Sequence, residues 1–361
     1  MKNVLITGGA GFIGSNFIYY LHSQDKNINI FNLDLLTYAG NAENLSDIHS
    51  TNYHFVKGDI CDHDLVANLF RQYDIDTVVH FAAESHVDRS IANPLRFMQT
   101  NIIGTATLLE CALHYWENKK SLNPELCRFH HISTDEVYGS LNKGDPPFSE
   151  KTPYAPNSPY AASKAASDHI VRSYYHTFKL PITITNCSNN YGPYQYPEKL
   201  IPLIIQNALQ GKQLPIYGDG KQIRDWLYVE DHCEAIYQVI EKGTAGETFN
   251  VGGNNQPYNI DIVKTICKIL DDQLPHSAHR PHAQLIQYVA DRPGHDRRYA
   301  MDISKIQKQL GWEPRESLES GLLKTVGWYL EHPNWINAIL NRTEYQEWIK
   351  ANYKSREVIK K

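Results

Sequence analysis

The fold is decided near the start of the chain by the stretch Val4-Leu5-Ile6-Thr7-Gly8-Gly9-Ala10-Gly11-Phe12-Ile13-Gly14. A short apolar run leads into a glycine-rich turn and then into the first residues of a predicted helix. Two triplets fit the spacing of a dinucleotide-binding turn, either Gly9, Gly11 and Gly14 or Gly8, Gly11 and Gly14. Glycine is needed because the backbone must turn tightly and let a pyrophosphate approach the N–H groups of the first helical turn. The stretch therefore predicts a strand, a turn and a helix that together bind a dinucleotide.

An acidic residue after the second predicted strand indicates which dinucleotide is bound. Asp34 follows Gly14 by 20 residues, and a carboxylate there can accept both ribose hydroxyls and would repel a 2′-phosphate. No Arg or Lys occurs in Leu35–Tyr38, so NAD is favoured over NADP. The alternative is a structural glycine turn followed by a chance aspartate.

Two later strand ends extend the predicted cofactor site. Asp59-Ile60 could cap the adenine edge, or Asp59 could simply form a turn at the strand end. Phe81-Ala82-Ala83 places small residues where a dinucleotide would lie against the sheet. In the loop that follows, Asp88 and Arg89 could contact a ligand or pair with each other.

The composition describes a folded chain without an obvious charged partner. The 361 residues are 42% hydrophobic and 21% charged, which excludes a disordered chain. The net charge of −5 comes with no long basic run, so neither nucleic acid nor an anionic membrane surface is indicated. No apolar stretch reaches the roughly 18 residues of a membrane span. The N-terminal run leads straight into the glycine turn and is expected to be mature structure, not a signal peptide.

The cysteines and histidines indicate a reducing compartment and no metal. The six cysteines are widely spaced, with no C-x-x-C and no histidine at zinc-finger spacing. Unpaired thiols in the cytoplasm are therefore expected. The scattered histidines, including His130-His131, show no metal-ligand spacing, so no metal is predicted.

Strand-like and helix-like segments alternate over the first 190 residues. The predicted strands are Val4–Thr7, Ile28–Leu33, Tyr53–Val56, Thr77–His80, Phe129–Ser133 and Ile182–Asn186. The predicted helices are Phe12–Ser23, Asp64–Tyr73, Asn101–Trp116 and Pro159–Phe178. Strands that alternate with helices pair in parallel through right-handed crossovers. The prediction is an α/β fold with a doubly wound parallel (Rossmann) sheet.

The pattern changes beyond Tyr191, where Pro and Gly become frequent. Further helices are predicted near Leu200–Leu209, Asp231–Lys242, Ile260–Leu270 and Leu318–Leu330. The strand-like runs Trp226–Val229 and Thr248–Val251 could return to the first sheet, so two parts are expected to interleave. We predict an NAD-binding domain of residues 1–188 plus 226–251, and a smaller substrate-binding domain of residues 189–225 plus 252–361.

A tyrosine and a lysine are expected on one face of the helix that begins at Pro159. With Ser158 as the N-cap, Tyr160 and Lys164 are four residues apart on that helix. A phenol with an ordinary pKa near 10 is a poor base at neutral pH. An ammonium within hydrogen-bond reach, together with the positive nicotinamide ring of NAD, would favour the phenolate. Ser133-Thr134, at the end of the fifth predicted strand, could orient the substrate hydroxyl. The alternative is an exposed Tyr–Lys neighbour pair.

Taken together, these motifs resemble the extended branch of the short-chain dehydrogenase/reductase superfamily, which acts on nucleotide sugars. Within that branch, Ser133-Thr134-Asp135-Glu136-Val137-Tyr138-Gly139 resembles the motif of the dTDP-glucose 4,6-dehydratase family, in which the Asp-Glu pair is an added acid and base. The resemblance covers nearly the whole chain and includes residues 83–90, 101–105, 185–193, 197–202, 224–232 and 291–298.

The resemblance implies a hydro-lyase reaction, and the chemistry of the residues favours it as well. The hydrogen on C5 of a hexose is not acidic, but oxidation at C4 places C5 next to a ketone. Tyr160 would take the proton of the 4-hydroxyl, Glu136 would remove the C5 proton, and protonated Asp135 would protonate the departing 6-hydroxyl. Return of the hydride to C6 from tightly bound NAD leaves a 4-keto-6-deoxy sugar. Adjacent carboxyls with opposite protonation states fit such an acid–base pair. The alternative is that Asp135-Glu136 only caps a loop.

The resemblance also implies three sets of site residues. The catalytic set is Thr134, Asp135, Glu136, Tyr160 and Lys164. The NAD set is Gly8, Gly11, Phe12, Ile13, Gly14, Asp34, Leu35, Thr37, Asp59, Ile60, Phe81, Ala82, Ala83, Ser85, Thr100, Tyr160, Lys164 and Asn190. The substrate set is Ser85, His86, Thr134, Asn189, Lys199, Leu200, Pro215, Tyr217, Arg224, Asn259, Arg292 and His295, in which the two arginines would bind the diphosphate.

Other functions of the same fold leave different marks on the sequence. A 4-epimerase needs no acid and base beyond the tyrosine, so Asp135-Glu136 argues against it, and a UDP-glucuronate decarboxylase needs a pocket basic enough for the sugar carboxylate. A non-catalytic NAD-binding protein would usually have lost Tyr160, Lys164 or an acid. The resemblance further implies a cytoplasmic homodimer formed through Asn101–Trp116 and Pro159–Phe178, and a role in deoxysugar biosynthesis such as that of dTDP-L-rhamnose.

Overall fold

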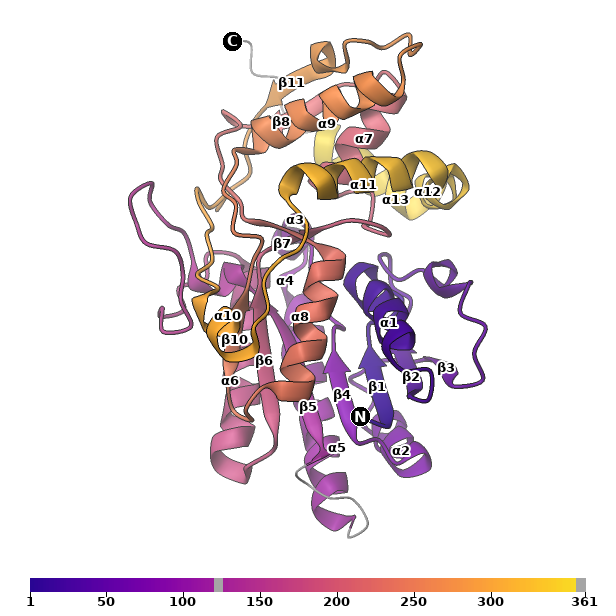
Figure 1. Ribbon diagram of the computed structural model, residues 1–361, viewed down its shortest axis with the longest axis vertical. Helices are drawn as coiled ribbons and strands as arrows, with labels where there is room; N and C mark the ends of the chain where they lie inside the picture. The colour runs from indigo at the N-terminus through magenta and orange to yellow at the C-terminus, as the bar shows by residue number, and fades with distance from the viewer. Residues whose placement is uncertain (120–125, 355–361) are drawn as a thin grey trace.

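A seven-stranded parallel sheet forms the centre of the computed structural model, which describes residues 1–119 and 126–354 (Figure 1). The strands lie in the order β3-β2-β1-β4-β5-β6-β10. They span Asn3–Thr7 (β1), Asn29–Asp34 (β2), Tyr53–Lys57 (β3), Thr77–His80 (β4), Arg128–Thr134 (β5), Ile182–Cys187 (β6) and Thr248–Val251 (β10). The first strand lies inside the sheet and the chain winds outward on both sides of it, so the predicted Rossmann fold is confirmed.

Helices cover both faces of this sheet. α1 (Phe12–Gln24) and α8 (Val229–Lys242) pack together on one face, and α2 (His63–Tyr73), α5 (Thr105–Asn118) and α6 (Pro159–Phe178) pack on the other. The pleat of β1 explains the two layers, because Leu5 points into the core beneath α2 and α5, whereas Val4 and Ile6 point into the core beneath α1 and α8.

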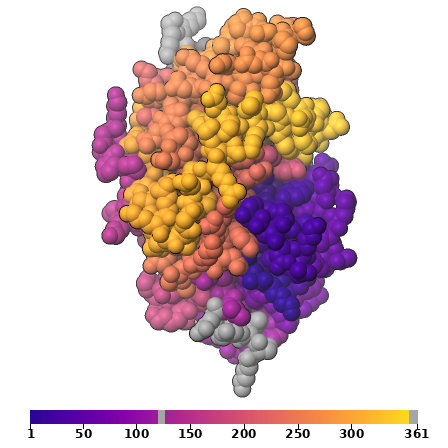
Figure 2. Space-filling model, viewed as in Figure 1, coloured from indigo at the N-terminus to yellow at the C-terminus, as the bar shows by residue number. Residues whose placement is uncertain are grey.

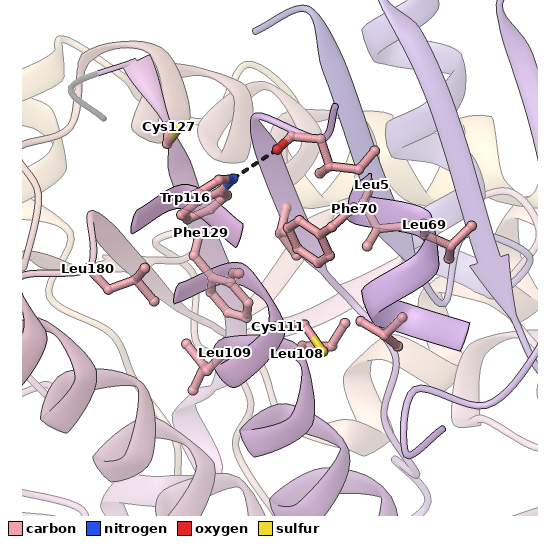
Figure 3. Close-up of a cluster of buried hydrophobic side chains, with 14 of the residues drawn as sticks. Leu5, Leu69, Phe70, Leu108, Leu109, Cys111, Trp116, Cys127, Phe129 and Leu180 are labelled. Atoms are coloured by element: carbon pink, nitrogen blue, oxygen red, sulfur yellow. Dashed lines mark hydrogen bonds between the residues drawn. The ribbon is translucent and has the colours of Figure 1, made fainter. Parts of the chain in front are cut away.

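Aromatic side chains fill the core between the sheet, α2 and α5. Phe70, Trp116 and Phe129 are buried there together with leucines from both helices (Figure 3). The indole N–H of Trp116 donates to the Ile75 carbonyl at 2.8 Å, so the one polar atom of this side chain is satisfied. This packing holds the helices against the sheet and fixes the strand ends above it.

The two runs that the sequence predicts to rejoin the sheet behave differently. Thr248–Val251 pairs with β6 as predicted. Trp226–Val229 does not join the sheet, so that prediction is wrong. Its first three residues form β9 (Trp226–Tyr228), which pairs with β7 (Asn189–Tyr191) in a separate two-stranded sheet. The reason is the large rings of Trp226 and Tyr228, which are buried in the hydrophobic core of the second region.

Most of the remaining elements lie together above the main sheet in Figure 1. They are α7 (Leu200–Leu209), β8 (Leu214–Tyr217), α9 (Asn259–Gln273), β11 (Ile286–Val289), α11 (Leu318–Glu331), α12 (Pro333–Leu340) and α13 (Thr343–Lys354). α10 (Ser304–Leu310) instead packs beside β10 of the main sheet. The C-terminal segments, orange and yellow in Figure 2, pack directly against the N-terminal ones. The division into two domains at the stated residues remains a prediction.

Short helical segments connect the fourth and fifth strands. α3 (Val87–Ala92) and α4 (Pro94–Phe97) lead into a π-helical turn over Met98–Gly104. The helix predicted over Asn101–Trp116 therefore begins as this turn and continues as α5. Within residues 1–119 and 126–354, no helix has both the length and the apolar character that a membrane crossing requires.

Candidate active site

A cavity of about 660 Å³ follows the carboxyl ends of the central strands and reaches into the second region. Ligands of open α/β sheets bind at this edge. Every residue that the sequence predicts to contact NAD lines the cavity, and so do the five predicted catalytic residues. The substrate set is divided. Its cavity-lining members are Ser85, Thr134, Asn189, Lys199 and Leu200, whereas His86, Pro215, Tyr217, Arg224, Asn259, Arg292 and His295 lie outside the lining.

The structure decides between the two glycine triplets. Gly8, Gly11 and Gly14 line the cavity, whereas a Cβ on Gly9 would lie 2.3 Å from the Asn32 side chain on β2. Gly8 has φ +71° and lies so close to β4 that a Cβ would come within 2.6 Å of the Ala82 nitrogen. The cofactor turn is therefore Gly8-x-x-Gly11-x-x-Gly14, and Gly9 serves packing.

The start of α1 fits the pyrophosphate of NAD. Gly11 is the N-cap residue, no side chain caps the helix, and its first turn has no acidic residue. A Cβ on Gly11 would meet just one close atom, the Gly8 carbonyl oxygen at 3.2 Å. The first N–H groups of α1 thus have no side-chain cap at the cavity wall, where the helix dipole favours an anion.

Two aspartates shape the other end of the cofactor site. Asp34 accepts hydrogen bonds from the backbone of Ala10 at 2.9 Å and of Leu36 at 2.7 Å. Burial raises the pKa of Asp34, while these two bonds oppose the rise. Its carboxylate keeps lone pairs for ribose hydroxyls on the cavity side. Asp59 accepts from the Cys61 nitrogen at 2.9 Å, which is the expected turn at the strand end. It also lines the cavity, and its contact with the adenine stays a prediction.

Tyr160 and Lys164 lie on α6 as predicted, but their electrostatics differ from the expectation. Both side chains are buried, and Thr134 lies close enough to Tyr160 to lower the pKa of the phenol. Burial, and next the charge of Glu136, raise the pKa of Tyr160 well above its ordinary value. Lys164 Nζ donates to the Ile132 carbonyl at 2.7 Å and lies 3.3 Å from His131 Nε2. The protein surroundings of Tyr160 thus favour the neutral phenol.

Asp135 and Glu136 form a 3-10 turn directly after β5, with Thr134 as its cap. The Thr134 hydroxyl accepts from the Glu136 nitrogen at 3.2 Å and donates to Asp135 Oδ1 at 3.3 Å. The second carboxyl oxygen of Asp135 is buried and has no hydrogen-bond partner within the described part of the chain. It is therefore available to a ligand in the cavity.

The two carboxyls differ in proton affinity because their neighbours carry opposite charges. Burial raises the pKa of both. For Asp135 the rise is increased by the negative charges of Glu136 and Asp225. For Glu136 it is opposed by three cations, Arg292, Arg224 and Lys199. One carboxyl is thus suited to hold a proton and the other to accept one, which is the pattern of an acid–base pair.

Two of the substrate residues outside the lining, Arg224 and Arg292, act on the acid pair. Arg224 is buried and donates to the carbonyls of Ile223 at 2.8 Å and Asp296 at 2.9 Å. Arg292 is partly exposed, and its Nη1 lies 3.3 Å from Asp88 Oδ1. Both guanidinium groups lie close enough to Glu136 to influence its pKa, so they contribute a positive field at this end of the site.

Three other predicted substrate residues have partners within the protein. His295 Nδ1 lies 2.6 Å from Asp291 Oδ1, and its ring stands 6.1 Å from the ring of Tyr217. His86 Nδ1 accepts from the Arg89 nitrogen at the start of α3. Pro215 lies half-buried in β8, and the side-chain oxygen of Asn259 is buried and lacks a hydrogen-bond partner in the described structure.

The alternative in which Asp88 and Arg89 pair with each other is wrong. Arg89 Nη2 lies 3.0 Å from Glu198 Oε2, and Asp88 pairs with Arg292. Glu198 is a cavity residue that the site predictions missed, and its side chain is 1% exposed. The available signal was a carboxylate directly before Lys199 in a proline-rich loop. Other missed lining residues are Glu84, Arg96, Gln99, Cys187, Ser188, Gln195, Tyr196 and Trp226.

A dinucleotide cradle that opens onto a buried tyrosine can oxidise a carbon, and two carboxyls of unequal proton affinity can then act on the neighbouring carbons. This combination defines the class as an extended short-chain dehydrogenase/reductase with added acid–base chemistry. A family model described as GDP-mannose 4,6 dehydratase matches residues 5–325. The chain belongs to this family of sugar-nucleotide 4,6-dehydratases.

Comparisons with individual proteins are more specific than the family model. The chain is 54% identical to the dTDP-glucose 4,6-dehydratase of Shigella flexneri, over 98% of this chain and 99% of the relative. A crystal structure of dTDP-glucose 4,6-dehydratase from Bacillus anthracis in complex with NAD matches with a TM-score of 0.83 and 45% identity, over 94% of this chain and 100% of that one. A UDP-glucose 4-epimerase from Thermotoga maritima with UDP-glucose matches at TM-score 0.79 and 30% identity, over 91% and 99%.

Proposed function

We propose that the protein is an NAD-dependent dTDP-glucose 4,6-dehydratase, which converts dTDP-D-glucose into dTDP-4-dehydro-6-deoxy-D-glucose and water. The observation that carries this proposal is the opposite electrostatic environment of Asp135 and Glu136, next to Tyr160 in one cavity. The relatives at 54% identity bear this name.

The first task of the site is to oxidise C4. NAD in the cradle of Gly8, Gly11 and Gly14 supplies a hydride acceptor at C4 and later a hydride donor at C6. Tyr160 accepts the proton of the 4-hydroxyl, and Thr134, which lies close to that phenol, orients the same hydroxyl. Lys164, held by the Ile132 carbonyl, keeps a positive charge behind the tyrosine.

The second task is the elimination of water. Once C4 is a carbonyl, the C5 hydrogen is acidic, and Glu136 accepts it because three cations stabilise its ionised form. Asp135 donates its proton to the 6-hydroxyl, which leaves as water. Glu136 then holds the proton that C5 regains when C6 is reduced. Each carboxyl thus ends the elimination in the state opposite to the one in which it began it.

The same pair distinguishes this reaction from epimerisation. A 4-epimerase oxidises C4 and reduces it again, and it removes no proton from C5. Two buried carboxyls of unequal proton affinity would have no task in that reaction. Dehydration uses both carboxyls, so it explains why the site contains them although burying a carboxyl costs free energy.

The substrate enters from the second region. Arg224, Arg292 and Lys199 bring three positive charges to the end of the cavity opposite the glycine turn, and a nucleoside diphosphate requires such a field. Asn189, Leu200, Pro215, Tyr217, Asn259 and His295, with Ser85 and His86 from the first region, complete the proposed substrate site. The product supplies deoxysugar biosynthesis, such as the formation of dTDP-L-rhamnose.

We also propose a cytoplasmic homodimer formed through α5 and α6. Large apolar side chains are exposed beside these helices, with Leu95 78% and Ile103 48% accessible. All six cysteines are unpaired, which fits a reducing compartment. Light scattering of the purified protein tests the dimer, and a mass near 41 kDa would contradict it.

The proposed activity is tested by incubating the purified protein with dTDP-glucose, without added cofactor, and following the 4-keto-6-deoxy product by its absorbance in alkali. Product formation establishes dehydration with retained NAD. The same protein is offered UDP-glucose and UDP-glucuronate in parallel. A change at C4, or loss of carbon dioxide, in the absence of the dehydrated product would overturn the proposal.

A further inference from the structure

A buried polar network lies behind Lys164, away from the reacting groups. Lys164 is 4% exposed, and both His131 and Asp168 are 0% exposed. His131 Nε2 lies 3.3 Å from Lys164 Nζ and 3.2 Å from Asp168 Oδ1. Tyr160, Lys164 and Asp168 follow one another at four-residue intervals on α6, so the three side chains share one face of the helix.

The position of Asp168 is fixed by neutral donors on its other oxygen. Asp168 Oδ2 accepts from Ser133 Oγ at 2.8 Å, from the Tyr154 hydroxyl at 2.7 Å and from Asn186 Nδ2 at 3.2 Å. Burial alone would raise the pKa of Asp168, but the bonds and charges of His131, Lys164 and Tyr154 hold it below its ordinary value. These contacts therefore favour the ionised carboxylate inside the protein.

Two cations could balance that charge, and their positions differ. Arg172 lies one turn further along α6, and its guanidinium donates to the Tyr154 hydroxyl at 2.7 Å and to Thr248 Oγ1 at 3.3 Å. It reaches Asp168 through the phenol, on the Oδ2 side. Lys164 lies on the Oδ1 side, where Lys164 Nζ and Asp168 Oδ1 are both close to the same atom, His131 Nε2. His131 is neutral, because burial lowers its pKa to about 4.

We infer that Asp168 is a positioning residue of the reaction: it supplies the buried negative charge that keeps the Lys164 ammonium charged and in place behind Tyr160. The inference rests on the proposed function for its purpose, since the positive charge of Lys164 matters because Tyr160 must release its proton. Its physical content, an attraction between two buried charges that both lie beside His131 Nε2, can be measured without turnover.

The consequence is a lysine whose titration depends on a carboxylate that touches neither substrate nor cofactor. Burial lowers the pKa of Lys164 to about 8, and Asp168 opposes that effect. The other groups facing Lys164 are His131 from β5, His80 from β4 and Cys187 from β6. Both imidazoles are neutral, since burial lowers their pKa values, and burial holds Cys187 as the neutral thiol. Asp168 is thus the one negative charge of this set.

The test is a pH titration of Lys164 by NMR in protein labelled with carbon-13 at the lysine ε carbons. The signal is assigned by its loss in Lys164→Met. In Asp168→Asn the midpoint is expected to fall by about one pH unit or more, because an opposite charge within several ångströms is lost. In the matched control Tyr154→Phe, which removes one neutral hydrogen bond to the same carboxylate, the midpoint is expected to stay within a few tenths of a unit. An unchanged midpoint in Asp168→Asn overturns the inference.

A measurement on the unaltered protein keeps the test decisive if Asp168→Asn does not fold. There the inference requires Lys164 to be charged at neutral pH although it is buried, and a midpoint below about 7 contradicts it. Product formation from dTDP-glucose is followed over the same pH range. If the unaltered protein makes no product, the proposed function fails whatever the titration shows; if it does, and the alkaline limb of its rate fails to move in Asp168→Asn, this inference fails and the function stands.

Discussion

The cofactor half of the cavity and its substrate half are built on different principles. The cofactor half is made by backbone at the ends of neighbouring parallel strands, such as the turn at Gly8 and the loop after Asp34. The substrate half depends on long side chains from segments far apart in the chain, such as Lys199 in the lining and Arg224 and Arg292, whose charges act on the site from outside the lining. A spacing pattern can specify the first, because the sheet fixes where each strand ends. A spacing pattern cannot specify the substrate half, because the tertiary structure determines which side chains contact each other there.

Arginine pairing shows how this difference arises. Arg89 is adjacent to Asp88 in the sequence, yet it pairs with Glu198 across the cavity, while Asp88 pairs with Arg292. The Arg89 guanidinium also lies 3.7 Å from the centre of the Tyr38 ring. These contacts depend on how the second region sits on the sheet.

The largest effect is expected where the two halves meet, at Tyr160. Replacing it with phenylalanine removes the base and leaves the ring beside Phe97, so product formation should fall by about 10³–10⁴-fold. Retained NAD, measured after acid release, should be unchanged because the glycine cradle is intact. Turnover within tenfold of the unaltered protein would contradict the role of the phenol.

The substitution Glu136→Gln separates the two chemical tasks. It should slow product formation by about 10²–10³-fold, because the base for the C5 proton is gone. Oxidation at C4 does not need Glu136, so absorbance of reduced cofactor should build up on mixing with dTDP-glucose. An unaltered overall rate, or the absence of this absorbance in a variant that retains NAD, would exclude Glu136 as the C5 base.

The fold was predictable because its elements repeat the same local pattern. Six parallel strands and the helices around them follow from apolar runs, and the ends of most differ from the structure by one or two residues. The prediction for Trp226–Val229 failed because an apolar run of that length is compatible with any sheet. Only the tertiary packing of Trp226 and Tyr228 determines which sheet the strand joins. β8 and β11 are as long as β4, but a proline in β8 and a glutamine in β11 interrupt their apolar runs.

The same difference explains which site residues the sequence predicted. Gly8 and Gly14 were predictable because the close backbone contact at these positions leaves no room for a side chain, so only glycine fits. Glu198 was missed because its importance comes from Arg89 and His86, which reach it from another part of the chain. The environment that raises the pKa of Tyr160 could not be predicted from the sequence either, because burial depends on the whole folded chain.

A substitution in the substrate half should mainly weaken substrate binding. Arg292→Ala removes a guanidinium whose charge acts on Glu136, so KM for dTDP-glucose should rise about 10–100-fold, in line with 1.5–3 kcal/mol for hydrogen bonds to charged groups. Because one of the three cations that favour ionised Glu136 is lost, kcat should fall as well. Retained NAD should not change. Arg297→Ala is the matched control, because Arg297 is half exposed and pairs with Asp219 at the surface. Equal effects of the two substitutions would show that charge near the site, and not contact, is what matters.

The smallest effect is expected in the cofactor half, from one methyl group. Alanine at position 11 can adopt the backbone of Gly11, which has φ −81°, and its Cβ would stand at the bare start of α1. The protein should fold with an unchanged Tm and hold NAD about tenfold less tightly, equivalent to about 1.4 kcal/mol. Gly327→Ala, where a Cβ would meet no atom within 4 Å, is the control that should leave NAD binding unchanged. If Gly11→Ala instead lowers Tm while retained NAD stays constant, the backbone at this turn serves packing, and the contrast between the two halves of the cavity no longer holds.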